Sequence, residues 1–172
     1  MPSTYGFPGS CRLCHHHRVP IHLLRHAKAV DESAELSDES RYLTPRGRED
    51  ARAIGRALAQ LGIVPTAIVS SPLVRALQTA ELVAGLCAPE LAVTIDEALA
   101  PGRSLRRLLA GVAEYEGAIL VGHEPSISGL AAALTARLHF AAFKKAQLLR
   151  IEDAQPRWVL FPGDSVTRPC TS

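Results

Sequence analysis

Two histidines and two arginines are placed where their side chains could act together on a phosphoryl group. Arg25 and His26 follow a short apolar run, Arg75 begins an amphipathic run, and His123 follows a second apolar run. A phosphoryl group is a dianion, which planar guanidinium groups bind through paired hydrogen bonds. An imidazole can attack phosphorus, and positive charge around the transferring group supplies most of the catalysis. These residue types predict phosphoryl transfer without a metal or other cofactor.

The elements that position these residues follow from the alternation of short apolar runs with longer amphipathic ones. Strands are expected at 19–24, 67–70, 91–95, 118–121 and 147–151, with a last edge strand at 157–161. Helices are expected at 45–61, 72–86, 104–115 and 126–138. This order predicts a three-layer α/β/α sandwich with a mostly parallel central sheet. Because ligands of open α/β sheets gather at the carboxyl ends of the strands, the side chains that follow the strands should meet at one edge.

Two of the expected helices have well-marked starts. Thr44 and Ser71 are hydroxyl residues that could cap a helix, and each is followed by a proline suited to the first helical position. The second start places Arg75 in the first turn of its helix. Its guanidinium, the free backbone N–H groups and the positive end of the helix dipole could then face one anion.

The bulk charge of the 172-residue chain is close to neutral, with 19 Lys and Arg against 17 Asp and Glu. This balance does not indicate binding to nucleic acid or to an anionic membrane surface. No apolar stretch is long enough for a signal peptide or a membrane span. We expect a cytoplasmic monomer. A solvated face, or alternatively a surface for an acidic protein partner, is predicted for four arginines of the first helix, Arg46, Arg48, Arg52 and Arg56.

The length and the 47% hydrophobic content predict one domain, over residues 19–161. Residues 1–18 read as a poorly ordered leader and residues 162–172 as a C-terminal tail. The four cysteines form no disulfide framework, which favours a reducing compartment. In the leader, Cys11, Cys14 and His15 match the c-type haem attachment pattern. Because no export signal accompanies that pattern, a haem- or metal-binding protein is only an alternative, and we expect no cofactor.

Four segments carry a resemblance to the histidine phosphatase superfamily, which has the phosphoglycerate mutase-like fold, and within it to the SixA-type phosphohistidine phosphatases. They are HLLRHAKA at 22–29, LTPRGREDA at 43–51, SSPLVRALQTAELV at 70–83 and VGHEPSISGL at 121–130. The resemblance implies that His26 is the nucleophile and becomes phosphorylated. It implies that Arg25, Arg75 and His123 bind and stabilise the phosphoryl group.

Three further residues take their expected roles from the same resemblance. Superfamily members that cleave phosphate esters hold a carboxylic acid after the third strand, which here falls on Glu97. Because an imidazole leaves more easily than an alkoxide, a phosphohistidine phosphatase depends less on such an acid, and Glu97 is then auxiliary. Lys28, two residues after the nucleophile, is a candidate for substrate contact. Glu124, directly after His123, is expected at the rim of the site.

Three functions are compatible with these residues. The favoured one is a phosphatase that acts on a phosphorylated protein, such as a histidine phosphotransfer domain. The alternative within the superfamily is a phosphomonoesterase that hydrolyses a small phosphate ester with Glu97 as general acid. An alternative from another class is a non-catalytic phosphate-binding module, which would bind phosphate without turnover.

Overall fold

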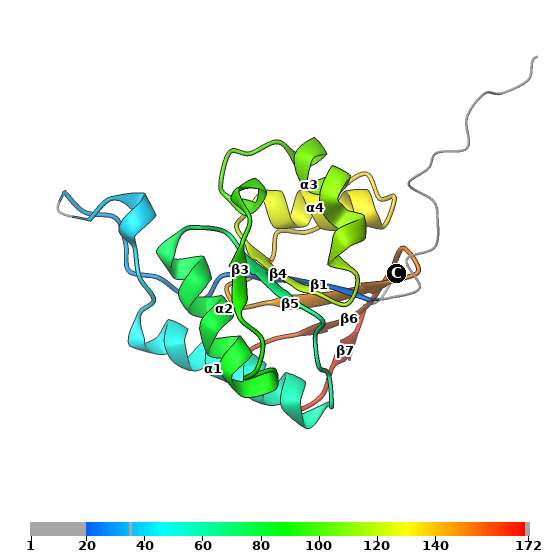
Figure 1. The fold of residues 1–172 in the computed structure, drawn as a ribbon, viewed down its shortest axis with the longest axis horizontal. Coiled ribbons are helices and arrows are strands. Elements are labelled where there is room, and N and C mark those ends of the chain that lie inside the picture. The colour runs from blue at the N-terminus through cyan, green and yellow to red at the C-terminus, as the bar shows by residue number, and fades with distance from the viewer. Residues whose placement is uncertain (1–19, 35, 171–172) are drawn as a thin grey trace, which may run out of the picture.

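The computed structural model describes residues 20–34 and 36–170. Within them, seven strands form one sheet in the order β3-β2-β4-β1-β5-β6-β7. The strands are β1 (Ile21–Arg25), β2 (Ile68–Ser70), β3 (Val93–Ile95), β4 (Ile119–Gly122), β5 (Leu148–Glu152), β6 (Gln155–Leu160) and β7 (Arg168–Pro169). The helices are α1 (Pro45–Gln60), α2 (Val74–Cys87), α3 (Leu105–Gly111) and α4 (Ser126–Leu134). Helices cover both faces of the sheet, which confirms the expected three layers (Figure 1).

The sheet is parallel in one half and antiparallel in the other. Strands β3, β2, β4 and β1 run parallel, whereas β5, β6 and β7 each run antiparallel to the preceding neighbour. The expected mostly parallel sheet is therefore correct only for the first half. A two-residue turn explains the β5–β6 pairing, because Asp153 and Ala154 both have positive φ, as tight hairpins require. The expected edge strand at 157–161 is β6, and β7, from the segment expected as a tail, pairs with its outer side.

Two hydrophobic clusters hold the layers together, one on each face of the sheet. Along β1, the buried Leu24 belongs to the cluster under α1 and α2, and the buried Leu23 belongs to the cluster under α3 and α4. This alternation is the two-residue period of a strand whose faces are both covered. The core thus fixes β1 and its neighbour β4, whose carboxyl ends carry the candidate site.

The helix starts confirm one predicted cap and correct the other. Thr44 caps α1 through its Oγ1, which accepts a hydrogen bond of 3.0 Å from the backbone N–H of Gly47. In contrast, α2 begins at Val74, and its N-cap residue Leu73 makes no side-chain capping bond. The Ser71 prediction is wrong by two positions, since the hydroxyl of Ser71 accepts from the Leu73 N–H at 3.3 Å outside the helix and lies against His123.

The two later helices are shorter than their periodicity predicts. The run at 104–115 divides into α3 and a 3-10 helix, Val112–Tyr115. The run at 126–138 is helical only to Leu134, and Ala136 has a φ of 52° that no α-helix continues. No helix among the described residues has the length and apolarity needed to cross a membrane. The expected leader, including its Cys11 and Cys14 pattern, lies outside the described residues.

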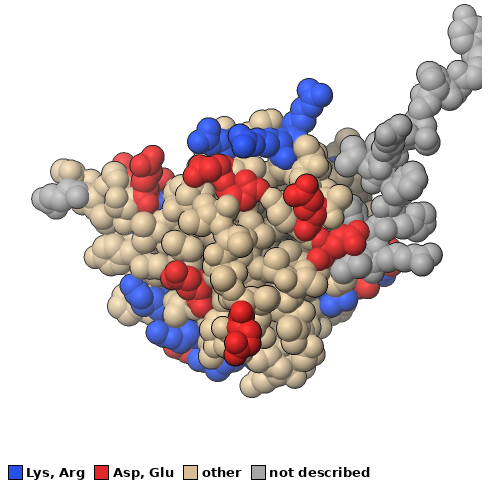
Figure 2. All heavy atoms as spheres, viewed as in Figure 1, with Lys and Arg blue, Asp and Glu red and all other residues tan. Residues whose placement is uncertain are grey.

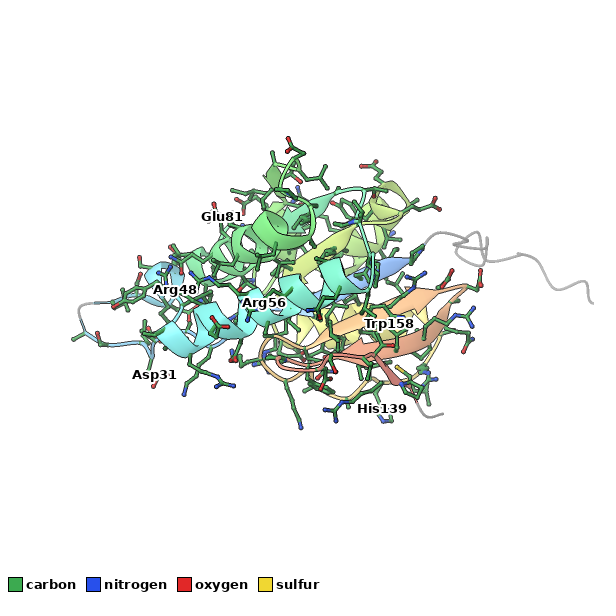
Figure 3. The ribbon with its side chains drawn as sticks, turned by 90° about the horizontal axis from the view of Figure 1, so that it is seen from below. Asp31, Arg48, Arg56, Glu81, His139 and Trp158 are labelled. Atoms are coloured by element: carbon green, nitrogen blue, oxygen red, sulfur yellow. The ribbon has the colours of Figure 1, made fainter. Side chains whose placement is uncertain are left out.

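The visible surface mixes basic and acidic side chains, with no face of a single sign in this view (Figure 2). Along α1, Arg46 lies 2.8 Å from Asp50, and Arg56 pairs with Glu49. Hydrogen bonding to Arg56 lowers the pKa of Glu49. These local pairs favour the solvated-face interpretation of the α1 arginines, of which Arg56 is exposed (labelled in Figure 3).

Candidate active site

The two histidines meet because their strands are parallel neighbours. The register of β1 and β4 pairs Arg25 with Gly122, so His26 and His123 are the next residues on adjacent strands. Their ring centroids lie 4.9 Å apart, and both side chains are buried. Arg75 enters from the first turn of α2, directly after β2. The structure thus brings together the four residues that the sequence placed at strand ends.

The hydrogen bonds of His26 define which of its nitrogens is free to react. Nδ1 lies 2.8 Å from the backbone carbonyl oxygen of Ala27. A carbonyl oxygen can only accept, so Nδ1 carries the proton and Nε2 presents a lone pair. Burial, together with the neighbouring Lys145 and His123, lowers the pKa of His26 to about 2. The imidazole is therefore neutral at physiological pH, with Nε2 unprotonated.

His123 has a fixed orientation beside His26. Its Nε2 lies 2.8 Å from the hydroxyl oxygen of Ser71. Burial and then the charge of Arg75 lower the pKa of His123 to about 3, so this ring is also neutral. Its Nδ1 is buried and has no hydrogen-bond partner within the described residues. An anion at this position would satisfy that nitrogen if it carries the proton.

Both arginines are fixed by backbone carbonyl groups. Arg25 donates through Nη1 to the carbonyl oxygen of Phe143, and Arg75 donates through Nη1 to that of Asp38. Arg75 also places Nη2 2.9 Å from Oδ2 of Asp38. Although burial opposes it, hydrogen bonds from Arg41 and Arg75 hold the pKa of Asp38 below its usual value. The carboxylate of Asp38 is thus bound to the guanidinium of Arg75, which the sequence analysis assigns to a phosphoryl group.

Lys145 is a site residue that the strand-end argument missed. Its Nζ lies 3.1 Å from Nε2 of His26. Lys145 precedes β5, and because β5 runs antiparallel to β1, the start of β5 lies at the edge where β1 ends. Two consecutive lysines directly before the predicted strand at 147–151 were the signal in the sequence. Burial, and then the charge of Arg25, lower the pKa of Lys145 to about 8.

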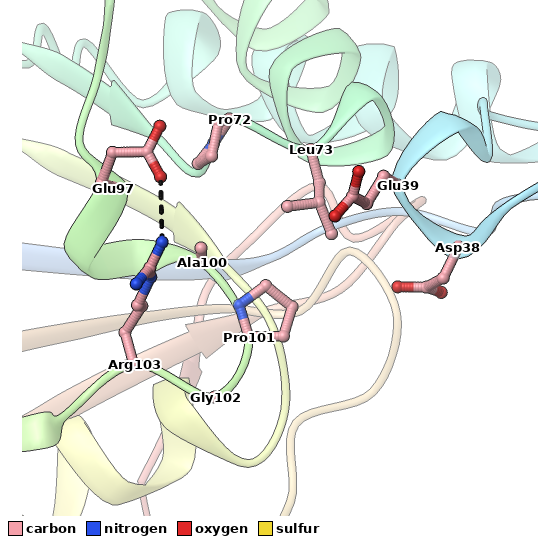
Figure 4. Close-up of a pocket in the computed structure, with 9 residues that line it drawn as sticks. All are labelled: Asp38, Glu39, Pro72, Leu73, Glu97, Ala100, Pro101, Gly102 and Arg103. Atoms are coloured by element: carbon pink, nitrogen blue, oxygen red, sulfur yellow. Dashed lines mark ion pairs between the residues drawn. The ribbon is translucent and has the colours of Figure 1, made fainter.

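Glu97 lies in a cleft beside this cluster. The carboxylate of Glu97 is exposed and forms an ion pair of 3.7 Å with Arg103 (Figure 4). The cleft has a volume of about 470 Å³, and Asp38 connects it to Arg75. Its lining residues are Asp38, Glu39, Pro72, Leu73, Glu97, Ala100, Pro101, Gly102 and Arg103. None of the four strand-end residues belongs to this lining.

Lys28 and Glu124 lie outside the cluster of histidine and arginine side chains. The side chain of Lys28 is exposed and forms no ion pair within the described part of the chain. Glu124, expected at the rim, is half-buried instead, because it accepts hydrogen bonds from the Ser128 hydroxyl at 2.6 Å and from the Phe143 N–H at 3.1 Å. It therefore anchors the segment that precedes β5.

Fold and site together define an α/β protein in which histidine and arginine side chains meet at one edge of the sheet. The family model of the histidine phosphatase superfamily (branch 1) matches residues 21–100. An uncharacterized protein of Picosynechococcus sp. is 33% identical over 148 residues, which cover 81% of this chain and 88% of that protein. The chain belongs to the histidine phosphatase superfamily.

Solved structures of SixA proteins share the fold. The protein histidine phosphatase SixA complexed with tungstate superimposes with a TM-score of 0.74 at 22% identity, over 83% of this chain and 97% of that one. A protein of Agrobacterium tumefaciens assigned to SixA gives a TM-score of 0.73 at 23% identity, over 85% and 99% of the two chains. These similarities confirm the predicted fold class.

Proposed function

We propose that this chain is a protein phosphohistidine phosphatase that works through a phosphohistidine on Nε2 of His26. The observation that carries the proposal is the neutral, buried His26, whose Nδ1–H is held by the Ala27 carbonyl so that Nε2 can attack. In the first step a bond forms between Nε2 and phosphorus while the P–N bond of the substrate breaks. In the second step water displaces Nε2 and releases inorganic phosphate.

Arg25, Arg75 and His123 are the proposed ligands of the phosphoryl oxygens. Their guanidinium groups and the neighbouring imidazole surround His26 from three strand ends, where positive charge and N–H donors stabilise the transferring group. Arg75 can offer its Nε–H, which has no hydrogen-bond partner among the described residues, to a phosphoryl oxygen, and the carboxylate of Asp38 competes for its Nη2. The tungstate complex of the SixA fold relative supports an oxyanion site in this architecture.

The position of Glu97 favours a phosphohistidine over a phosphate ester as substrate. Its carboxylate is exposed and paired with Arg103, and it lies in the cleft whose lining includes none of the four strand-end residues. An imidazole leaving group needs less help from a general acid than an alkoxide does. A small-molecule phosphomonoesterase is the second candidate, because the cleft beside Arg75 does include Glu97.

The test is turnover of two substrates by the purified protein in the presence of chelator. One is a phosphorylated histidine phosphotransfer domain and the other is p-nitrophenyl phosphate. We expect rapid dephosphorylation of the domain, slow ester hydrolysis, and a loss of at least about a thousandfold in His26→Ala. His139→Ala is the matched control, since His139 is an exposed histidine outside the site (Figure 3).

Each alternative has its own result in the same experiment. Faster ester turnover that falls in Glu97→Gln, with little action on the phosphorylated domain, would favour the phosphomonoesterase. Phosphate binding without turnover of either substrate, and without an acid-labile phosphoenzyme, would favour a non-catalytic module. Equal activity of His26→Ala and His139→Ala would refute the proposed nucleophile.

A further inference from the structure

The ammonium group of Lys145 points at the reacting atom of the proposed nucleophile. It lies 3.1 Å from Nε2 of His26, the nitrogen that the Ala27 carbonyl leaves unprotonated. An ammonium group has three donors and no acceptor, so it donates to the lone pair of Nε2. We propose that Lys145 is a further catalytic residue, whose ammonium donates to a phosphoryl oxygen when Nε2 bonds to phosphorus. This inference rests on the proposed function of His26.

The backbone on both sides of Lys145 is attached to the site. Two residues before it, the buried Phe143 donates its N–H to Glu124 and accepts from Arg25 through its carbonyl. One residue after it, Ala146 donates its N–H to the carbonyl oxygen of His26 at 3.3 Å. The Cα of Lys145 is thus held in place while its four-carbon side chain can move. That combination suits a group that must follow a phosphoryl oxygen over a short distance.

The contact changes partner during the proposed reaction. Once Nε2 forms its bond to phosphorus, its lone pair is used and can no longer accept from Lys145. The phosphoryl oxygens that surround the phosphorus lie close to the same ammonium and gain charge in the transition state. Lys145 then donates a charge-assisted hydrogen bond to one of these oxygens. No proton is transferred in this exchange, so the lysine stays charged throughout.

The charge of Lys145 depends on pH within the working range of the site. The charged and titratable groups that face it are Arg25, His26, Asp38, Arg41, Arg75 and His123. Burial and the three arginines lower the pKa of Lys145 to about 8, and Asp38 opposes them. The ammonium is present below that pH and is lost above it. Activity of the free enzyme, measured as kcat/KM, should therefore fall as pH rises through about 8.

Lys145→Met tests the proposal, with Lys144→Met as a matched control. Lys144 is the adjacent lysine, but its side chain is exposed and its Nζ lies 5.6 Å from the centroid of the Phe161 ring. We expect Lys145→Met to lower kcat/KM for the phosphorylated phosphotransfer domain by about 10- to 100-fold, the range of a lost charged hydrogen bond. Inorganic phosphate, titrated by calorimetry at pH 7, should bind about tenfold more weakly. Lys144→Met should change neither value by more than about twofold.

The pH profile separates a catalytic contact from a structural one. Wild type should lose activity above about pH 8, Lys145→Met should show no such loss, and Lys145→Arg should keep part of the activity and extend it to higher pH. Equal kcat/KM and equal phosphate affinity in Lys145→Met and Lys144→Met would overturn the proposal. If Lys145→Met fails to fold, Lys145→Arg and the wild-type profile decide. If the wild type is inactive, the proposed function fails, and phosphate binding still tests the contact.

Discussion

Gly47 is the residue of α1 at which an added methyl group would disturb the site most directly. A Cβ at this position would lie 2.0 Å from the carbonyl oxygen of Lys28, two residues after His26. That oxygen cannot retreat freely, because it accepts hydrogen bonds from the Thr44 N–H at 3.0 Å and from its hydroxyl at 3.2 Å. In Gly47→Ala the backbone of Lys28 must therefore move away from Thr44.

The magnitude follows from what this movement breaks. The two hydrogen bonds contribute about 1 kcal/mol each, and overpacking against backbone costs about 1–3 kcal/mol. Alanine returns about 1 kcal/mol through its higher helix propensity. We expect a net loss of about 2–4 kcal/mol in the free energy of unfolding. Because Lys28 is so close to His26, we also expect lower kcat at temperatures where the variant is folded.

The assay is urea unfolding followed by circular dichroism, with Gly85→Ala as the matched control. Gly85 lies in α2, and a Cβ there would meet no heavy atom within 4 Å. That variant should gain up to about 1 kcal/mol. A Gly47→Ala protein as stable as wild type, or shifted in the same direction as Gly85→Ala, would show that the contact with Lys28 is not the reason for the glycine.

Three further predictions follow from other contacts. Thr79 accepts from the Ala27 N–H at 3.1 Å, so Thr79→Val should lower the free energy of unfolding by about 1–3 kcal/mol in urea, and an unchanged value would contradict that bond. Asp38→Asn removes the carboxylate that competes for Arg75, so inorganic phosphate should bind up to about fivefold more tightly by calorimetry, whereas weaker binding would contradict competition. Burial, and then Arg150, lower the pKa of His22 to about 4. Below about pH 6.5 the unfolded chain therefore binds more protons at His22 than the folded chain does. The urea midpoint should fall between pH 7 and pH 5, and it should fall less in His22→Leu. Equal declines in the two proteins would show that other groups are responsible.

The sequence predicted the part of the site that follows from strand ends. His26, Arg75 and His123 come after consecutive parallel strands, and all such ends meet at one edge. The position of the first helix was equally predictable, because Thr44 and the following proline act only on local backbone. The helix start depends only on local backbone, and the meeting of the strand ends follows from the general rule for parallel sheets.

The missed features depend on contacts between distant segments. Lys145 reaches His26 only because β5 runs antiparallel to β1, and the two lysines before that strand do not by themselves specify this pairing. Asp38 begins a short 3-10 helix, Asp38–Ser40, which contacts Arg75 and Arg41 and has no apolar periodicity to predict it. The start of α2 lies two residues later than predicted, at Val74, and the hydroxyl of Ser71 lies against His123. For Lys145 and Asp38, contacts between distant segments decide the position.

The position of β1, between parallel β4 and antiparallel β5, has a consequence for folding kinetics. The contact between His26 and Lys145 joins residues 119 positions apart, so it forms only after β5 has paired with β1. Contacts of such long sequence separation are slow to form because loop closure must be achieved first. During refolding, the helical signal from α1 and α2 should therefore recover before the ability to bind phosphate. Recovery of phosphate binding would therefore mark the stage of refolding at which β5 has paired with β1.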